Sequence, residues 1–282
     1  RLCEHPMRSA VGRWVCQETQ RPIEVCALSP KPPVPPTVRP EITRRHLLYH
    51  IYPTRVNDGW LQNVRQLRRR LELFNGRSIF AVATGPETHR LSVVRATLDW
   101  PDAEFLEIPN DAELREAVTF RRVLAELDTI HVSEAFFFAH TKGNSNTAMA
   151  VDGMVYWRNA MYHHLLDRWP EVSDMLRTAA MVGTHKMEWS EKRDSPFPTR
   201  IRPQHAWMFA GTFFWARCDA VFARPNWRDV PRDRYGAEAW PATLFRRGDV
   251  ACIWSPWVCP ACPTPNPYDP AIYTEPTADE PV

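Results

Sequence analysis

Four short apolar segments between residues 46 and 140 constrain the fold more than any other feature of the sequence. They read HLLYHIY (46–52), SIFAVAT (78–84), EFLEIP (104–109) and SEAFFFAH (133–140). Each segment has the length and the residue types of a buried strand. Helical patterns follow the first and the third segment, and this alternation predicts an α/β sheet with largely parallel strands.

The two helices of this region have apolar faces and recognisable ends. The first is marked by apolar residues at helical spacing and closes at Asn75-Gly76; these residues are Trp60, Val64, Leu67, Leu71 and Phe74. The second begins at Asn110, which with Glu113 resembles a capping box, and it runs to about Leu127.

The second half of the chain continues the alternation. A long amphipathic helix is predicted from Met154 to Trp169, with Pro170 just past its end. The segment TAAMVGTH (178–185) reads as a further strand, and YGAEAWPATLF (235–245) as the start of a helix. Residues 186–204 are polar and contain prolines, which predicts a mobile loop, and a very apolar segment broken by Gly211 follows at 206–217.

Prolines divide the chain into parts. The stretch KPPVPPTVRP (31–40) can form neither a helix nor a central strand, because proline fixes φ and lacks an N–H donor. We therefore expect a small cysteine-containing segment over 1–30, a semi-rigid linker over 31–40 and one large domain over 41–255. Residues 256–282, rich in proline and cysteine, predict an irregular tail.

Composition excludes some classes of protein. The net charge is +2, which does not by itself indicate a nucleic-acid partner. No apolar run approaches the roughly 20 residues that span a bilayer, and no secretory signal is visible, so we expect a cytoplasmic protein. The odd number of cysteines, seven, argues against a disulfide scaffold and favours a reducing compartment.

Polar residues follow the fourth strand directly. His140, Thr141, Lys142, Gly143 and Asn144 come after the apolar run AFFFA, and ligands of open α/β sheets bind beyond the carboxyl ends of the strands. A lysine there suits a phosphate, and an adjacent glycine allows close approach of the backbone. The alternative is that His140 satisfies a buried carbonyl and Lys142 is a turn residue.

Two later segments place similar residues at predicted strand ends. Gly183, Thr184 and His185 end one strand, and the segment HAWMFAGTFFWAR carries candidates for the same pocket; these candidates are His205, Gly211, Thr212 and Trp215. The aromatic residues of that segment have core packing as an alternative role. Alternation along a strand would point Thr212 and Trp215 to opposite faces, unless Gly211 disturbs the register.

A carboxylate and a guanidinium complete the set of candidates. Glu238 lies between small and aromatic residues in YGAEAWP, where it is a candidate general base, although a glutamate in the first turn of a helix is also favoured by the helix dipole. Arg158, on the predicted helix YWRNAM, is a candidate partner for a phosphate or for Glu238, with a buried structural ion pair as the alternative.

Five ordered motifs resemble a family of bacterial and viral glycosyltransferases. They are FFFAHTKGNSN, YWRNAMYHHLL, MVGTHK, HAWMFAGTFFWAR and YGAEAWP, and they span roughly residues 46–255. The resemblance implies a GT-A-like, three-layer α/β sandwich that binds a nucleotide-sugar at its strand ends. In these roles Lys142, His140 and Asn144 would contact the donor phosphates, while the pocket residues would line the sugar or acceptor site and Glu238 would take the acceptor proton.

The chain departs from typical GT-A enzymes in one respect. These enzymes carry an Asp-x-Asp motif that holds a divalent cation against the donor diphosphate, and this chain contains no such motif. A cation-independent or weakly dependent reaction is therefore expected, with Lys142 and His140 neutralising the leaving diphosphate.

Cysteines at both ends offer structural zinc sites. Cys259 and Cys262 have zinc-knuckle spacing with Cys252 upstream, and a second set lies near the start of the chain, formed by Cys3, His5, Cys16 and Cys26. Free thiols are the alternative.

Three functions follow from these patterns. The first is an enzyme that transfers a sugar from a nucleotide-sugar to a polysaccharide, a protein or a modified DNA base; for a DNA acceptor, the arginines between residues 65 and 70 should lie near the pocket. The second is a non-catalytic protein that binds nucleotides or carbohydrates. The third is a zinc-linked interaction protein whose cysteine-rich ends carry the function.

Overall fold

The computed structural model describes residues 6–8, 14–16, 38–142, 151–188, 207–233 and 235–255. The chain divides into two compact units, residues 1–37 and residues 38–282. Within the first unit, β1 (Pro6–Arg8) pairs with β2 (Trp14–Cys16) in antiparallel fashion. The sheet that positions the candidate site belongs to the second unit.

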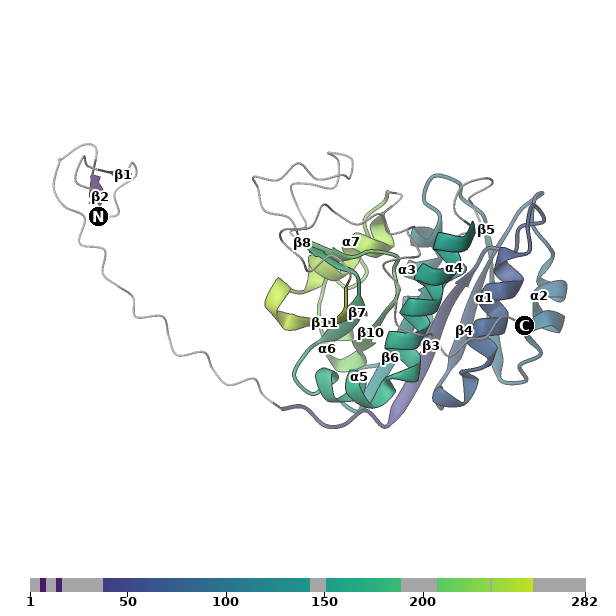
Figure 1. The fold of residues 1–282 in the computed structure, drawn as a ribbon, viewed down its shortest axis with the longest axis horizontal. Helices are drawn as coiled ribbons and strands as arrows, with labels where there is room; N and C mark the ends of the chain where they lie inside the picture. Colours follow the sequence, from purple (N-terminus) through teal and green to yellow (C-terminus); the bar gives the residue numbers. More distant parts are fainter. Residues whose placement is uncertain are drawn as a thin grey trace. The chain divides into compact units, whose positions relative to one another are not determined.

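A seven-stranded sheet forms the centre of the second unit, in the order β11-β7-β10-β6-β3-β4-β5 (Figure 1). Its strands are β3 (Arg44–Ile51), β4 (Ser78–Thr84), β5 (Ala103–Pro109), β6 (Glu134–His140), β7 (Met181–Thr184), β10 (Phe214–Arg217) and β11 (Val250–Trp254). Neighbouring strands are parallel except where β10 is involved, because β10 runs antiparallel to both β6 and β7. The predicted mostly parallel sheet is confirmed.

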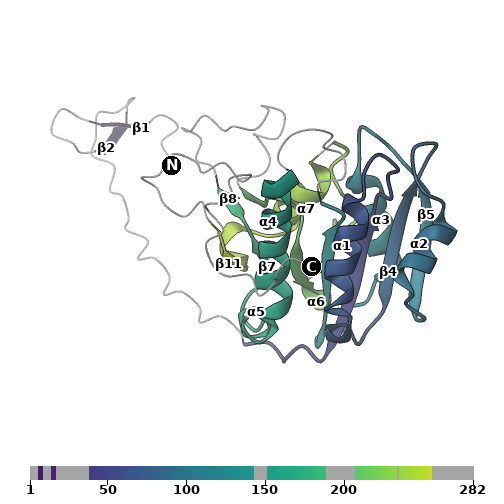
Figure 2. The same ribbon diagram turned by 45° about the vertical axis from the view of Figure 1, so that its right-hand side comes forward.

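Helices cover both faces of this sheet, so that the unit has three layers (Figures 1 and 2). One face packs against α1 (Gly59–Arg68), α2 (Leu91–Leu98), α4 (Val151–Tyr162) and α5 (Trp169–Leu176). The other packs against α3 (Glu116–Leu127), α6 (Cys218–Phe222) and α7 (Gly236–Leu244). Strand alternation explains the two cores, since Tyr49 of β3 joins the first and its neighbour Leu48 joins the second.

Short elements complete the described parts. They are the 3₁₀ turns Leu71–Leu73 and Arg247–Asp249, the π-helical turn His163–Asp167, and an antiparallel pair formed by β8 (Lys186–Glu188) and β9 (Trp207–Phe209). Residues 189–204 of the predicted loop lie outside the described residues. None of the helices described is both long enough and apolar enough to cross a membrane.

Three of the predicted helix boundaries were wrong, and two short helices, α2 and α6, were missed. The first helix ends at Arg68, and the apolar residues that follow belong to a separate 3₁₀ turn. The side chain of Asp111, rather than Asn110, accepts the N–H groups of Glu113 and Leu114, and α3 begins only at Glu116. Helix α2 was not predicted, since its eight residues give a short apolar pattern.

The helix predicted to end before Pro170 continues beyond it. A π-helical turn separates α4 from α5, and Pro170 lies in the first turn of α5. Proline is tolerated there because the first N–H groups of a helix have no partner within the helix.

A buried arginine joins several segments at the amino-terminal edge of the sheet. The Arg217 side chain has no exposed surface, and its guanidinium donates to the carbonyl oxygens of Pro40 (3.0 Å), Leu176 (3.2 Å) and Val132. Its Nε donates to Asp219 at 3.0 Å. One planar cation thereby satisfies carbonyls that have no strand partner at this edge.

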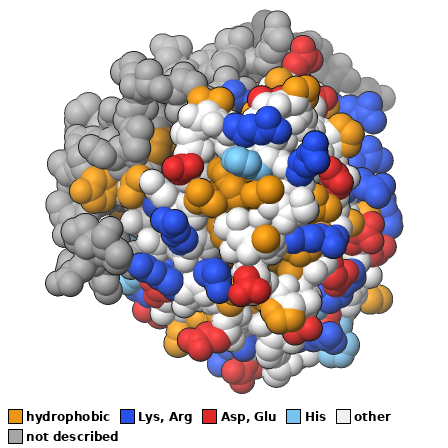
Figure 3. Space-filling view, turned by 90° about the vertical axis from the view of Figure 1, so that its right-hand side faces the viewer, with side chains coloured by type: hydrophobic (Ala, Val, Ile, Leu, Met, Phe, Trp, Pro, Cys, Tyr) orange, Lys and Arg blue, Asp and Glu red, His pale blue; other side chains and the backbone are white. Residues whose placement is uncertain are grey.

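Opposite charges are interspersed on the face at the β5 end of the sheet (Figure 3). Two of the arginines between residues 65 and 70 have carboxylate partners: Arg68 pairs with Asp99 at 3.8 Å, and Arg70, just past α1, pairs with Asp167 at 2.6 Å.

Candidate functional site

The polar residues after β6 lie at the carboxyl edge of the sheet, beside the end of β3. Thr141 donates its backbone N–H to the carbonyl of His50 (3.0 Å), and its side-chain oxygen accepts the backbone N–H of Tyr52 (2.9 Å). These two bonds hold together the ends of neighbouring parallel strands. Thr141 is 4% exposed, so its hydroxyl serves this junction.

Asn63 of α1 fixes the backbone of Lys142. Its carboxamide oxygen accepts the N–H of Lys142 (3.1 Å), and its nitrogen donates to the carbonyls of Lys142 (3.1 Å) and Gly59 (2.8 Å). The Lys142 ammonium lies over the Trp157 ring of α4, 4.1 Å from its centre, in a cation–π contact. A half-buried cation is thus positioned at the strand end.

The backbone of one residue, Gly211, joins His140 to Glu238. The imidazole Nε2 of His140 lies 3.0 Å from the carbonyl oxygen of Gly211, and the N–H of Gly211 donates to Glu238 Oε1 at 2.8 Å. The connection depends on the antiparallel strand β10, because its preceding turn reaches the edge at which the parallel strand β6 ends. Glu238, in the first turn of α7, is buried at 9% exposure.

The turn at Gly211 has a backbone conformation that favours glycine. Gly211 has φ +91°, and Thr212 follows with φ +62°. A Cβ added to Gly211 would lie 3.0 Å from Met161 Sδ and 3.2 Å from the Trp157 ring. The dihedral angle favours glycine, and a Cβ would fit only if the Met161 and Trp157 side chains shifted slightly.

Burial keeps the histidines of this edge neutral. Desolvation, with the nearby Lys142 ammonium, lowers the pKa of His140 to about 3, and desolvation lowers the pKa of His50 to about 4. The ring of His140 therefore donates from Nε2 to Gly211 and carries no positive charge at neutral pH. Lys142 and His140 were both expected to neutralise a diphosphate, and of the two only Lys142 is a cation at neutral pH.

The strand end that carries His185 lies against the same edge. His185 has no exposed surface and lies between two indoles, with ring centres 5.5 Å from Trp157 and 4.9 Å from Trp254. Desolvation lowers its pKa well below the usual value. Two hydroxyls here, those of Thr184 and Thr212, are buried and have no hydrogen-bond partner among the described residues.

Two further candidates are buried. Trp215 is fully buried, donates its indole N–H to the carbonyl of Leu165 (2.8 Å) and packs against Phe74 and Trp169. Arg158 is 4% exposed and donates to the side chain of Asn159. Gly143, Asn144 and His205 lie outside the described residues.

Several residues of this edge were not predicted from the sequence. Tyr52 and Asn110 both donate to Glu87 Oε1, at 3.2 and 2.8 Å, and thus connect the ends of β3, β4 and β5. A hydrogen bond from the Glu87 backbone, together with those from Asn110 and Tyr52, lowers the pKa of Glu87. Asn63 was also missed, although a polar residue on the apolar face of the first predicted helix was a usable signal.

The described residues directly after β6 do not fit a divalent cation. Thr141 and Lys142 offer a hydroxyl committed to Tyr52 and an ammonium, whereas Mg²⁺ is bound through carboxylates and phosphates. The carboxylate joined to His140 through the Gly211 backbone, that of Glu238, accepts the Gly211 N–H with its Oε1.

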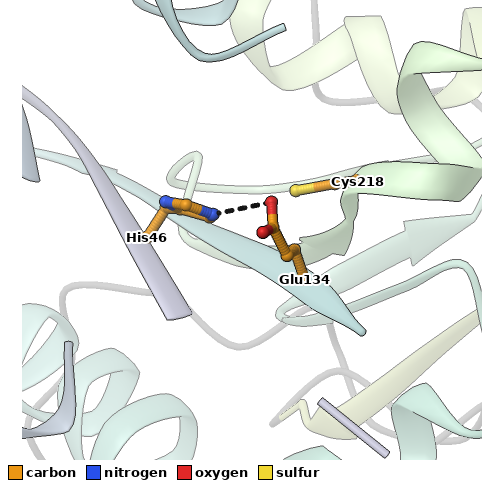
Figure 4. Close-up of side chains that lie close together, drawn as sticks. All are labelled: His46, Glu134 and Cys218. Carbon is orange, nitrogen blue, oxygen red and sulfur yellow. Dashed lines mark hydrogen bonds and ion pairs between the residues drawn. The ribbon is translucent and has the colours of Figure 1, made fainter. Parts of the chain in front are cut away.

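A different cluster has metal-ligand chemistry, at the opposite edge of the sheet. His46, Glu134 and Cys218 offer ligand atoms within 4.8 Å of one another (Figure 4). However, His46 Nδ1 accepts the N–H of Arg77 at 2.9 Å, so the neutral ring carries its proton on Nε2, 3.2 Å from Glu134. A metal on Nε2 would move that proton to Nδ1, against the Arg77 N–H.

The remaining contacts of this cluster fit a structural role. Thr129 donates to Glu134 at 3.0 Å, and the Arg44 guanidinium lies 3.7 Å from the same carboxylate. Desolvation lowers the pKa of His46, and burial beside Glu134 raises the pKa of the Cys218 thiol, so that both groups are neutral.

The zinc predictions are not supported by the part of the chain that the structure describes. Cys252 lies on β11, and its sulfur lies 3.3 Å from the carbonyl oxygen of Trp254. Cys259 and Cys262 lie outside the described residues, as do Cys3, His5 and Cys26, and of Cys16 only the backbone is described.

Comparison with known protein families and with curated proteins gave no match. Among solved structures, 4-diphosphocytidyl-2C-methyl-D-erythritol synthase aligns with 76% of this chain and 90% of its own, at 12% identity and a TM-score of 0.42. A protein of Desulfovibrio desulfuricans G20 described as a nucleotide-diphospho-sugar transferase aligns over 76% and 83%, at 11% identity and a TM-score of 0.38. At these scores the likeness carries no argument about function.

Proposed function

We propose that the chain is a glycosyltransferase that uses a nucleotide-sugar donor. One observation carries the proposal: the backbone N–H and C=O of Gly211 join the strand end of His140 and Lys142 to the buried carboxylate of Glu238. A cation and a carboxylate are thereby associated with one strand edge, where ligands of open α/β sheets bind. The resemblance of the ordered motifs to a glycosyltransferase family supports the same function.

The roles follow from the chemistry of sugar transfer. An acceptor oxygen attacks the anomeric carbon, the bond from that carbon to the phosphate oxygen breaks, and its electron pair leaves with the diphosphate. Lys142 stabilises the charge that develops on the leaving group. In an inverting reaction Glu238 takes the proton of the acceptor hydroxyl. His140 positions the Gly211 turn, and we assign it no direct part in the reaction.

Donor turnover tests this function. We expect the purified chain to hydrolyse or transfer at least one member of a panel of nucleotide-sugars. Lys142→Ala should lower kcat by about 100-fold or more, since a preorganised charge at the leaving group is removed. Glu238→Gln should lower it by about 100- to 10,000-fold while it retains an oxygen for the Gly211 N–H.

Lys186→Ala is the matched control, because its ammonium donates to the Arg247 carbonyl (2.9 Å) and we assign it no role. Unchanged kcat in both site variants would refute the assignments. Binding of a nucleotide-sugar without turnover of any donor would instead support the alternative function, a non-catalytic binding protein.

Metal removal gives a second test. Because the chain has no Asp-x-Asp and Lys142 supplies a charge at the strand end, we expect turnover to survive excess chelator with at least half of the original rate. The measurement is initial rate before and after dialysis against EDTA. If dialysis abolishes turnover and added Mg²⁺ or Mn²⁺ restores it, a divalent cation neutralises the diphosphate instead.

A further inference from the structure

A hollow with a volume of about 440 Å³ lies between α3 and the segment that leads into α7. Three guanidiniums line it, together with one carboxylate, one hydroxyl and an apolar wall. The cations are Arg121, Arg228 and Arg232, and the other lining residues are Asp229, Thr243, Val230 and Pro231. Cations therefore outnumber carboxylates in its lining.

One of these arginines is held in place by its surroundings. The Arg228 guanidinium lies 3.9 Å from the centre of the Trp227 ring and pairs with Asp128 at 2.8 Å. Trp227 is itself 3% exposed, and its carbonyl accepts the indole N–H of Trp240 of α7 at 2.8 Å. The cation is thus positioned on a rigid support before any ligand arrives.

The other two arginines are exposed and face the same space. Within the described ranges, no ion pair involves Arg121 or Arg232. Like charges repel when they are gathered around one hollow, and an anion relieves that repulsion. The planar guanidinium matches the oxygen atoms of a phosphate with two parallel hydrogen bonds, which makes phosphate the anion that such a lining favours.

We propose that this hollow binds a small phosphorylated molecule, at a site separate from the sheet edge. Its volume lies in the range of small-molecule sites, and the wall of Val230 and Pro231 suits a less polar part of the ligand. Thr243 follows Glu238 by five residues, which turns it about 140° around the α7 axis. The hollow therefore lies on another side of α7 from the carboxylate, and the proposal does not depend on the transferase activity.

Calorimetric titration of the full chain with inorganic pyrophosphate tests this site. The Lys142→Ala background removes the cation proposed for the donor, so that heat from the sheet edge does not obscure the hollow. We expect binding to persist in that background. The additional changes Arg121→Ser and Arg232→Ser should weaken it at least tenfold, and both residues are exposed, so the fold is retained.

The matched control removes two exposed arginines outside the hollow, Arg65 and Arg122. In the same background, Arg65→Ser with Arg122→Ser should change the Kd by less than twofold. Absence of pyrophosphate binding in the Lys142→Ala chain would overturn the proposal. Equal weakening by the control pair would also overturn it, because the effect would then reflect overall charge.

Discussion

At the scale of single residues, the buried histidines of the sheet edge link the candidate site to the stability of the fold. Desolvation lowers the pKa of His140 to about 3 and the pKa of His50 to about 4, from an ordinary value of 6.5. At pH values between the folded and the unfolded pKa, these histidines are therefore protonated in the unfolded chain and neutral in the folded chain. Stability is fully present above about pH 6.5 and is lost as the pH falls toward 4.

His140→Gln tests this linkage. Glutamine can still donate to the Gly211 carbonyl but does not titrate, so the dependence of unfolding free energy on pH between 4.5 and 5.5 should become shallower by about 1.4 kcal/mol per pH unit. Urea unfolding at several pH values measures it, and the region above pH 7 is an internal control in which both slopes should agree. An unchanged slope in the acid range would contradict a neutral buried His140.

Gly211→Ala tests the turn that connects His140 and Glu238. We expect a loss of about 1–3 kcal/mol of stability, because alanine disfavours φ +91° and its Cβ would lie 3.0 Å from Met161 Sδ. Gly248→Ala is the control, since nothing lies within 4 Å of an added Cβ there. Denaturant titration compares the two variants, and equal losses would show that the Gly211 turn is not under steric constraint.

At the scale of secondary-structure elements, the sequence pattern predicted the strands whose limits are set by local residue types. The strands β3, β4, β5 and β6 were predicted because short apolar runs end at Gly, Pro or polar residues. The end of α1 and the whole of α2 were not predicted. Tertiary packing decides where a short apolar pattern stops being helical.

The candidate site was predictable only in part, for the same reason. The sequence identified the polar run after β6 and the glutamate of α7 as site candidates. It also predicted that the site lies at the carboxyl edge of the sheet. The hydrogen bonds that join them were not recognisable, because they require the antiparallel direction of β10. No local pattern distinguishes Trp215, which packs in the core, from an aromatic residue that lines a pocket.

At the scale of the whole molecule, Arg217 connects segments that lie far apart in the sequence. Arg217→Met should cost about 3–5 kcal/mol, because the carbonyls of Pro40 and Leu176 would lose a buried donor. Arg217→Lys should restore little, since an ammonium cannot reproduce the planar fork. Unfolding free energies measure both variants.

The control for this prediction is Arg122→Met, which removes an exposed side chain whose ion pair with Glu126 spans 4.0 Å. Such pairs contribute about 0–1 kcal/mol. A loss at Arg217 no larger than the loss at Arg122 would show that water replaces the guanidinium at this edge.

The position of β10 between β6 and β7 also has a consequence for synthesis on the ribosome. β7 joins the sheet only through β10 and β11, and both of these strands follow it in the chain. A nascent polypeptide that ends before residue 214 therefore leaves β6 with an open edge and β7 unattached. Almost half of the strands assemble together late in translation, and until then the exposed edge of β6 is a target for chaperones.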